Sequence, residues 1–319
     1  MEGMEMNAEA IGFMLHMAIR NGTPLLLGTI GEIYAERSGV MNLGIEGIML
    51  VGAVTGFITA LATGHLWLGF VAASLVGLAL ALIHAFVSVT LYANQVVSGL
   101  ALTMLGVGLS SLMGRGYVEE ALPSSMLMLP IRIPGLSDLP VIGIGLFYQD
   151  PLAYFALGLA FISWIVLYKT SWGIAIRAVG DDPASADAAG IDVYLVRYAC
   201  VAFGGAMAGL AGSYLSLVLI HDWIEGMTVG KGWIVVALVV FALWDPLRAI
   251  VGAYLFGWTE VLKYQPFMRA IGISPPLLDM LPYVATILAM LVGVSEVIRK
   301  KVGAPAALGK PYIREERVI

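Results

Sequence analysis

The sequence predicts an all-α protein, a polytopic transmembrane helical bundle of about 8–10 spans that forms one domain over residues 1–319. Two observations lead to this prediction. Of the 319 residues, 60% are hydrophobic and only 12% are charged, whereas about a quarter of the residues in a soluble domain are charged. The apolar residues also gather into long runs, which leave no stretch long enough for a separate soluble domain.

A transmembrane helix needs about 20 mostly apolar residues. Clear candidate runs lie near residues 44–63, 66–90, 95–114, 151–169, 195–220, 229–244, 249–263 and 277–297. The run 229–244 is short, so we expect it to tilt or to enter the membrane only part-way.

The N-terminal region differs from these runs. Residues 10–19 and 24–31 are each too short to span, and a polar stretch that includes Arg20 and Pro24 separates them. Arg20 is paired, or snorkels to the interface, or marks an interfacial first helix followed by a span from Pro24. With this region the total is about nine spans.

Lysine and arginine in short loops favour the cytoplasmic side and thereby orient a membrane protein. The connection 169–197 and the tail after the last run, about 298–319, are both basic. Four candidate runs lie between them, and the turn in the middle carries Arg248. We therefore expect the connection, the turn and the C-terminus to be cytoplasmic and the loop 115–150 to be outside. An odd number of spans would place the N-terminus outside as well.

The chain lacks the sequence signatures of soluble enzymes. No G-x-x-x-x-G-K-[ST] phosphate loop occurs, so ATP would have to bind to another chain. The four histidines lie in different segments without the spacing of metal ligands, and the single cysteine, Cys200, lies in an apolar run. We therefore expect no catalytic residue, no metal and no cofactor in this chain. No basic tract interleaved with aromatic residues indicates nucleic-acid binding.

Glycines recur at small-xxx-small spacing, as in the pairs Gly52 with Gly56 and Gly205 with Gly209. In lipid, helices associate through close packing at small residues. Tight helix packing is therefore sufficient to explain most of the 38 glycines.

Polar residues run from the first span into the second over residues 31–50. Glu46 lies there at or inside a membrane boundary, and an intramembrane carboxylate is a functional candidate because its burial is costly. Alternatively, this carboxylate faces headgroup water or pairs with Arg37. The sequence leaves both interpretations open.

The connection between the runs 151–169 and 195–220 contains signals for a short helix. Asp182 can cap the helix N-terminus, with Pro183 at the first helical position. Residues 184–189 favour a helix and Gly190 ends it. A short surface helix with small side chains suits docking into a groove on a partner protein, although an ordinary helical loop is the commoner case.

Several stretches resemble the permeases of bacterial nucleoside ABC importers. They are residues 31–50, 94–102, 177–192, 227–234 and 281–283, and the resemblance covers nearly the whole chain. The wider group also transports simple sugars and branched-chain amino acids.

The resemblance implies the ABC importer permease fold and a multi-pass subunit of the bacterial inner membrane that translocates nucleosides and is not itself an enzyme. It also implies cytoplasmic ATPase subunits that bind ATP, a second permease that is a copy or a relative, and an extracytoplasmic substrate-binding protein. The coupling segment would be about 170–195, with candidate ATPase contacts at Arg177, Asp181, Asp182, Pro183, Ala184, Gly190 and Ile191. Candidate residues of the translocation path are Asn42, Glu46, Asn94, Gln95, Ser98, Thr103 and Trp233.

The chain departs from the pattern of these permeases at three places. Asparagine is common where it has Thr103, and arginine is common where it has Lys231. A basic residue is usual before Pro246, where this chain has Asp245. The difference at Thr103 bears on a polar path contact, and the one before Pro246 bears on an ATPase contact. All three bear on substrate or partner preference.

Other functions compete with this one. Within the same class, the alternative is a simple-sugar or branched-chain amino-acid permease. From a different class, the rival is an ion-coupled secondary transporter with Glu46 as its coupling carboxylate. The centres of the spans are almost free of charge, which favours the ATP-driven class. An intramembrane enzyme is disfavoured because no pair of catalytic groups falls at matched depth in adjacent spans.

Overall fold

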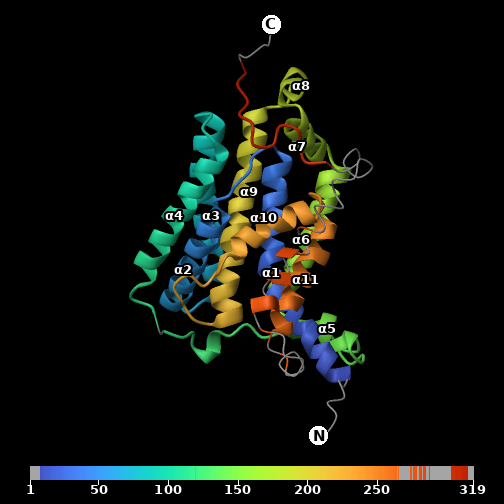
Figure 1. Cartoon of the computed structure of the whole chain (residues 1–319). Coiled ribbons are helices and arrows are strands. Elements are labelled where there is room, and N and C mark those ends of the chain that lie inside the picture. Colours follow the sequence, from blue (N-terminus) through green and yellow to red (C-terminus); the bar gives the residue numbers. More distant parts are fainter. Residues whose placement is uncertain are drawn as a thin grey trace.

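The structure is a computed structural model that describes residues 8–118, 120–263 and 303–314, together with separate residues between 265 and 287. The described chain is a bundle of helices, which confirms the predicted fold class (Figure 1). Within it, β1 (Ile131–Arg132) and β2 (Tyr148–Gln149) form a small antiparallel pair. Most of the predicted run 277–297 lies outside the described residues.

Among the described residues, five helices are long and apolar enough to cross a membrane. With the π-helical turns that continue two of them, their positions agree with predicted runs to within two residues, because length and apolar composition together determine a span. They are α2 (Ile45–Thr63), α3 (Leu66–Ala85), α4 (Gln95–Gly114), α6 (Pro151–Lys169) and α9 (Val193–Tyr214). Two of them continue as π-helical turns, α3 through η1 (Phe86–Thr90) and α9 through η3 (Leu215–Ile220).

The first helix, α1, runs without a break from Ala8 to Arg37. The two short apolar runs and the polar stretch between them therefore belong to one helix. The Arg20 guanidinium lies inside the fold, where Nη2 donates to the Val218 carbonyl at 2.8 Å and Nε lies 3.8 Å from the buried Asp150 carboxylate. Arg20 is thus paired, which is the first of the three alternatives that the sequence left open.

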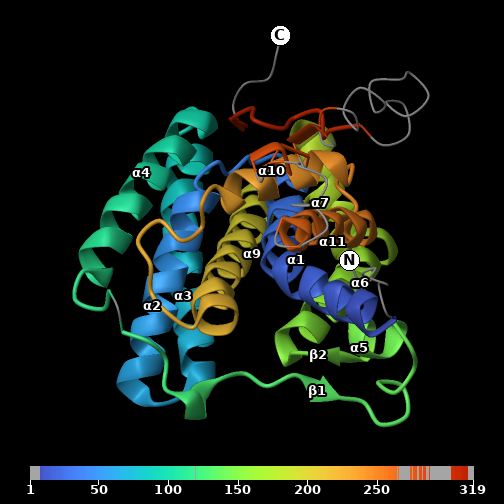
Figure 2. The ribbon, with the colours of Figure 1, turned by 60° about the horizontal axis from the view of Figure 1, so that its bottom comes forward.

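The central helix of the bundle is α9, which packs against α1, α2 and α3 (Figures 1 and 2). A Cβ atom on Gly52 of α2 would lie 2.5 Å from the Gly209 carbonyl oxygen, and one on Gly205 would meet Gly77 and Ala81 of α3. The glycine pairs therefore serve close helix packing, as predicted. Cys200, also on α9, is only 4% exposed.

After α9, a non-helical segment over residues 221–230 leads to α10 (Lys231–Phe241), a helix of 11 residues. At a rise of 1.5 Å per residue it covers ~16 Å, about half of a bilayer's hydrocarbon core. The helix is therefore short, as its apolar run indicated, and whether it tilts or enters only part-way stays a prediction. A turn then leads to α11 (Pro246–Leu262), which Asp245 caps by accepting from the Leu247 and Arg248 amides. Capping explains why an aspartate precedes Pro246 in this chain.

The two ends of the bundle carry different segments (Figure 1). One end, called here the α8 end, holds α7 (Ser171–Asp181), α8 (Pro183–Ala188) and residues 303–314. The opposite end, called the loop end, holds the start of α1 and the loop 115–150 with η2 (Ser124–Met126) and α5 (Ile142–Phe147). The start of α1 and residues 303–314 thus lie at opposite ends of the bundle.

Candidate functional site

Between α1 and α2 the chain leaves helical structure inside the bundle, over residues 38–44. Three predicted path residues of α4 lie along this segment. Gln95 Oε1 accepts from the Met41 amide at 2.8 Å, and Thr103 Oγ1 donates to the Leu43 carbonyl at 2.9 Å. Ser98 lies 3.0 Å from His84 Nδ1, whose other ring nitrogen lies 3.1 Å from the Met41 carbonyl. Gln95 and Thr103 are eight residues apart, ~12 Å along the axis of α4, so the segment lies beside the first part of that helix.

Asn42 lies on this segment and is 1% exposed. Its amide donates to Glu32 Oε1 at 2.8 Å, and its side-chain oxygen accepts from the Gly44 amide at 3.0 Å. Asn42 Nδ2 and Glu32 Oε2 are buried without a hydrogen-bond partner among the described residues. Sequence reasoning did not select Glu32 or Glu36, although both are buried. Their i, i+4 spacing, which places both on one helix face, was the available signal.

Glu46 lies at the start of α2 and is 7% exposed. Its Oε1 accepts from the Thr228 hydroxyl at 2.5 Å and from the Gly230 amide at 3.0 Å. Its Oε2 accepts from the Gly232 amide at 2.6 Å. The carboxylate therefore faces neither headgroup water nor Arg37, whose guanidinium donates instead to the Trp244 carbonyl and Tyr168 hydroxyl.

The residues around this carboxylate, Glu46, Thr228, Gly230 and Gly232, are called here the Glu46 junction. The first amides of a helix have no partner within the helix and carry a partial positive charge. Glu46 lies in the first turn of α2 and accepts from the Gly232 amide in the first turn of α10. The carboxylate therefore supplies a partner for one of the first amides of α10. A Cβ atom on Gly232 would lie 2.5 Å from Glu46 Cα, so only glycine permits this approach.

Trp233 and Asn94 lie apart from this cluster of hydrogen bonds. Trp233 follows the junction on α10 and is 38% exposed. Asn94 caps α4, with its side-chain oxygen accepting from the Val96 amide at 2.9 Å and the Val97 amide at 3.1 Å. Of the predicted path residues, the structure thus brings together those on segment 38–46 and on the inner face of α4.

The predicted surface helix is present as α8. Asp182 caps it by accepting from the Ser185 amide at 3.1 Å, and the Ser185 hydroxyl also donates to Asp182. These bonds, led by that of the hydroxyl, lower the pKa of the Asp182 carboxyl. Pro183 occupies the first turn, and Gly190 follows the helix with φ +86°. The predicted start, first residue and stop of this helix are confirmed.

The candidate ATPase contacts differ in exposure. Asp181, Asp182, Ala184 and Gly190 are exposed at the α8 end, whereas Pro183 and Ile191 are half-buried. Arg177 points back toward the bundle, since its Nε donates to the Gly173 carbonyl at 3.3 Å and its guanidinium lies 5.4 Å from the centre of the Tyr168 ring.

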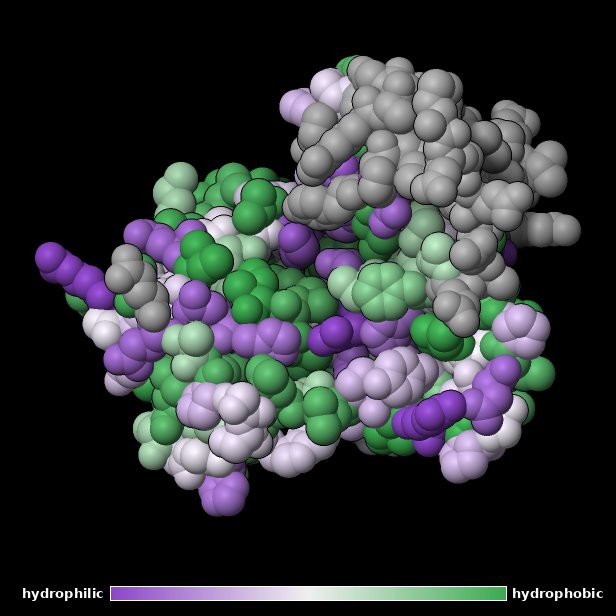
Figure 3. All heavy atoms as spheres, turned by 90° about the horizontal axis from the view of Figure 1, so that it is seen from below, coloured by the Kyte–Doolittle hydropathy of each residue, from purple (hydrophilic) through white to green (hydrophobic). Residues whose placement is uncertain are grey.

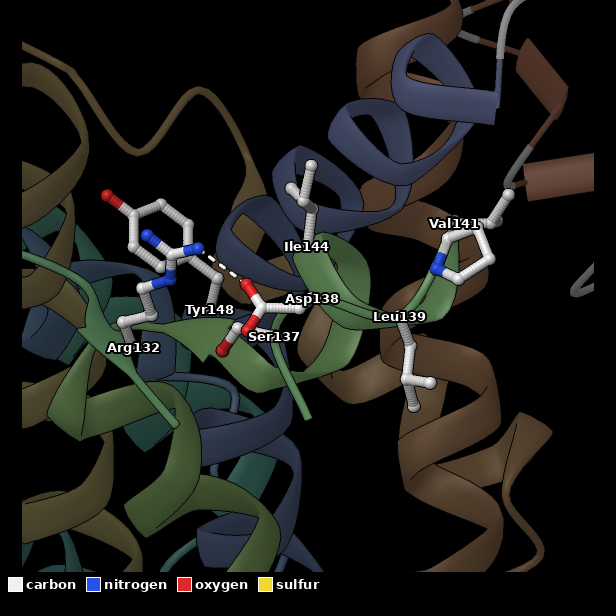
Figure 4. A pocket seen from close by; sticks show the side chains of 8 residues that line it. Arg132, Ser137, Asp138, Leu139, Val141, Ile144 and Tyr148 are labelled. Atoms are coloured by element: carbon white, nitrogen blue, oxygen red, sulfur yellow. Dashed lines mark hydrogen bonds and ion pairs between the residues drawn. The ribbon is translucent and has the colours of Figure 1, made fainter. Parts of the chain in front are cut away.

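At the loop end, a cavity of about 660 Å³ opens beside α5 (Figure 4). The Arg132 guanidinium donates to the Asp138 carboxylate at 2.5 Å across one side of it. Hydrophilic and hydrophobic residues are mixed over the surface of this end of the molecule (Figure 3). The cavity is lined by Arg132, Ser137, Asp138, Leu139, Pro140, Val141, Ile144 and Tyr148.

Comparison with known proteins matches residues 14–293 to the family described as "Branched-chain amino acid transport system / permease component". A protein of Haloferax volcanii, TsgC13, provisionally named a glucose ABC transporter permease, is 40% identical over 95% of this chain and 98% of its own length. The guanosine ABC transporter permease protein NupQ of Bacillus subtilis is 35% identical, and the nucleoside ABC transporter permease protein NupC of Lactococcus lactis is 31% identical. Each of the last two covers 92% of this chain and 94% of its own length.

No solved structure matches this chain. The family match covers most of the sequence, and the relatives align over nearly their full lengths. The bundle of apolar helices is the architecture that such a membrane component requires. The chain therefore belongs to the family of permease components of branched-chain amino acid-type ABC transport systems.

Proposed function

We propose that this permease takes up nucleosides as the membrane-spanning subunit of an ABC importer, driven by ATP hydrolysis on partner subunits. The observation that carries the choice of substrate is the similarity to permeases named for guanosine and for nucleosides, each over 92% of this chain. The two relatives come from different bacteria, so the relationship does not rest on one protein.

In this proposal α8 is the coupling helix that docks on the ATPase. It is short, it is capped at both ends and most of its residues are exposed or half-buried, so it presents a rigid surface. Asp181, Asp182, Pro183, Ala184, Gly190 and Ile191 would form the contact. Arg177 would instead hold α7 against α6, because its guanidinium lies over Tyr168.

The translocation path would pass the Glu46 junction, where two helices begin inside the bundle. Non-helical backbone at membrane depth is tolerated where it is buried in protein or lines a cavity, and broken helices commonly form substrate sites in transporters. Trp233, exposed beside the junction, offers an aromatic face to a nucleobase. Both Glu46 oxygens are engaged by the chain itself, which favours a positioning role over binding of a coupling ion.

The partners follow from this arrangement. A second permease, either a copy or a related chain, would complete the path, and ATPase subunits would dock at a cytoplasmic α8 end. The C-terminus would then be cytoplasmic and the N-terminus outside. An extracytoplasmic substrate-binding protein would deliver substrate at the loop end, where hydrophilic side chains are exposed among apolar ones (Figure 3).

A sugar is the second candidate substrate. The relative provisionally named a glucose permease is 40% identical to this chain, a higher identity than either nucleoside relative. A nucleoside carries a pentose, so both candidates present hydroxyl groups to the path. The family description leaves branched-chain amino acids as a third class.

The decisive experiment is uptake of radiolabelled guanosine into vesicles that contain the permease with its ATPase and binding protein. Unlabelled adenosine, uridine, glucose and leucine serve as competitors, and an ATPase variant that cannot hydrolyse ATP serves as the control. We expect uptake that requires hydrolysis and that nucleosides alone compete. Competition by glucose would favour the sugar permease, and uptake driven by a proton or sodium gradient would overturn the ATP-driven mechanism.

A further inference from the structure

Residues 303–314, called here the tail, lie across the α8 end of the bundle (Figure 1). Pro305 and Ala307 are buried, so the tail packs into the surface. The Ala307 amide donates to the Gly180 carbonyl of α7 at 2.9 Å, and the Gly309 amide donates to the Gly39 carbonyl at 3.2 Å. These backbone bonds fix the tail to α7 and to the segment that leads to Glu46.

The other end of the tail clasps α8 at Asp187. Arg314 donates to both carboxylate oxygens, from Nε at 3.1 Å and from Nη2 at 3.0 Å, and the Tyr312 hydroxyl donates at 3.1 Å. Such a two-pronged arginine–carboxylate pair holds its partner in one orientation. A single exposed ion pair contributes little, and the Arg314 side chain is 68% exposed. The three bonds together with the backbone anchors therefore form the connection.

A buried arginine joins the tail to the interior segment a second time. Arg197, on α9, is 1% exposed. Its Nε donates to the Ser38 carbonyl at 3.2 Å and its Nη1 donates to the Lys310 carbonyl at 3.4 Å. The tail and segment 38–44 are thus held by the same side chain, within a few residues of the path candidates Asn42 and Glu46.

We infer that the tail is a strut between the coupling helix and the path. Asp187, Tyr312 and Arg314 would position α8, and Gly309, Gly39 and Arg197 would pass its movement to segment 38–44. The inference rests on the proposed role of α8 in docking the ATPase. It assigns the tail a part in transmission, and Asp187 the role of a positioning residue rather than an ATPase contact.

The test uses the assembled importer with its ATPase and binding protein. Asp187→Ala removes all three clasp bonds from the α8 side, and Arg314→Ala removes two from the tail side. The double variant D187R/R314D restores a pair of opposite charges, with the positive charge now on α8 and the negative charge on the tail. Lys310→Ala is the matched control, because it removes one charge from an exposed side chain of the same tail.

Two readouts are measured for each variant. The first is the amount of radiolabelled guanosine transported per ATP hydrolysed, alongside copurification of the ATPase. The second is hydrogen exchange of the backbone amides of residues 38–46, which requires no transported substrate. We expect both single variants to retain the ATPase, to transport about twofold to tenfold less per ATP, and to exchange faster over 38–46. The swap should recover most of the loss, and Lys310→Ala should match the wild type.

The strut is overturned if Asp187→Ala and Arg314→Ala keep the wild-type ratio and the wild-type exchange over 38–46. It is also overturned if Asp187→Ala is defective while Arg314→Ala is not, since Asp187 would then act as a direct ATPase contact. If the wild-type importer takes up no guanosine, the proposed substrate is refuted but the strut is not. The exchange measurement would still decide whether the tail transmits movement.

Discussion

Glu46 accepts a 2.6 Å hydrogen bond from the amide of Gly232, which ties the first turn of α2 to the first turn of α10. The two residues are far apart in the chain, and the bond lies inside the bundle. It makes the start of α10 dependent on one carboxylate, and several consequences can be measured.

Replacing Glu46 with alanine should destabilise the protein and abolish uptake. The change leaves the Thr228 hydroxyl and the Gly230 and Gly232 amides without their acceptor, and each unsatisfied buried donor costs about 1–3 kcal/mol. Glu46→Gln keeps one acceptor oxygen and should be intermediate. Thermal unfolding in detergent and vesicle uptake measure the two effects. Wild-type behaviour of Glu46→Ala would contradict the positioning role.

Replacing Gly232 with alanine should force α10 away from α2. The added Cβ would lie 2.5 Å from Glu46 Cα and 2.6 Å from its nitrogen, both of them backbone atoms. Overpacking of this kind costs about 1–3 kcal/mol. Gly108→Ala on α4 is the control, because its Cβ would meet nothing within 4 Å. Equal melting temperatures for the two variants would refute the close approach.

Replacing Asp182 with alanine should uncouple the importer by removing the cap of α8. Asparagine also accepts at this position, so Asp182→Asn should retain most of the uptake. Copurification of the ATPase and uptake per ATP hydrolysed are the measurements. If both variants lose uptake equally, the charge matters rather than the cap.

The same cap should depend on pH in a defined direction. The Ser185 bonds lower the pKa of Asp182 below its ordinary value, so its charged form is favoured in the folded state. The contribution of the cap is therefore present above the ordinary aspartate pKa and is lost as pH falls through the lowered one. ATPase binding by the wild type should be constant near neutrality, and a difference from Asp182→Asn should emerge only in acid.

Replacing Arg20 with leucine should destabilise the loop end of the bundle. Asp150 has no exposed surface and would keep only the Tyr214 hydroxyl and the Ala153 amide as donors. Removing one partner of a buried pair costs about 3–5 kcal/mol, and the 3.8 Å separation and partial exposure of Arg20 place this pair at the lower end. Arg20→Lys should lose less. Unchanged thermal unfolding of Arg20→Leu would show that the pair is dispensable.

The apolar spans and α8 were predictable because their signals are local. A run such as 95–114 carries its own length and composition, and Asp182, Pro183 and Gly190 punctuate a helix within nine positions. The half-length of α10 could be read from its short apolar run in the same way. None of these features requires knowledge of a distant neighbour.

The remaining features depend on partners far away in the chain. Nothing near Arg20 indicates that α1 continues through it, because the residue that compensates its charge is Asp150. Glu46 remained ambiguous since its donors lie at residues 228–232. Glu36 was missed for the same reason, as its oxygen accepts from the Trp244 indole at 2.6 Å.

The burial of Cys200 has a practical consequence for experiments on this protein. It is the chain's single thiol, and on α9 it is only 4% exposed. The wild-type sequence is therefore already a suitable background for site-directed labelling. A cysteine introduced on α8 would be the one thiol open to a bulky maleimide, so fluorescent or spin probes could follow its motion without first altering the native sequence elsewhere.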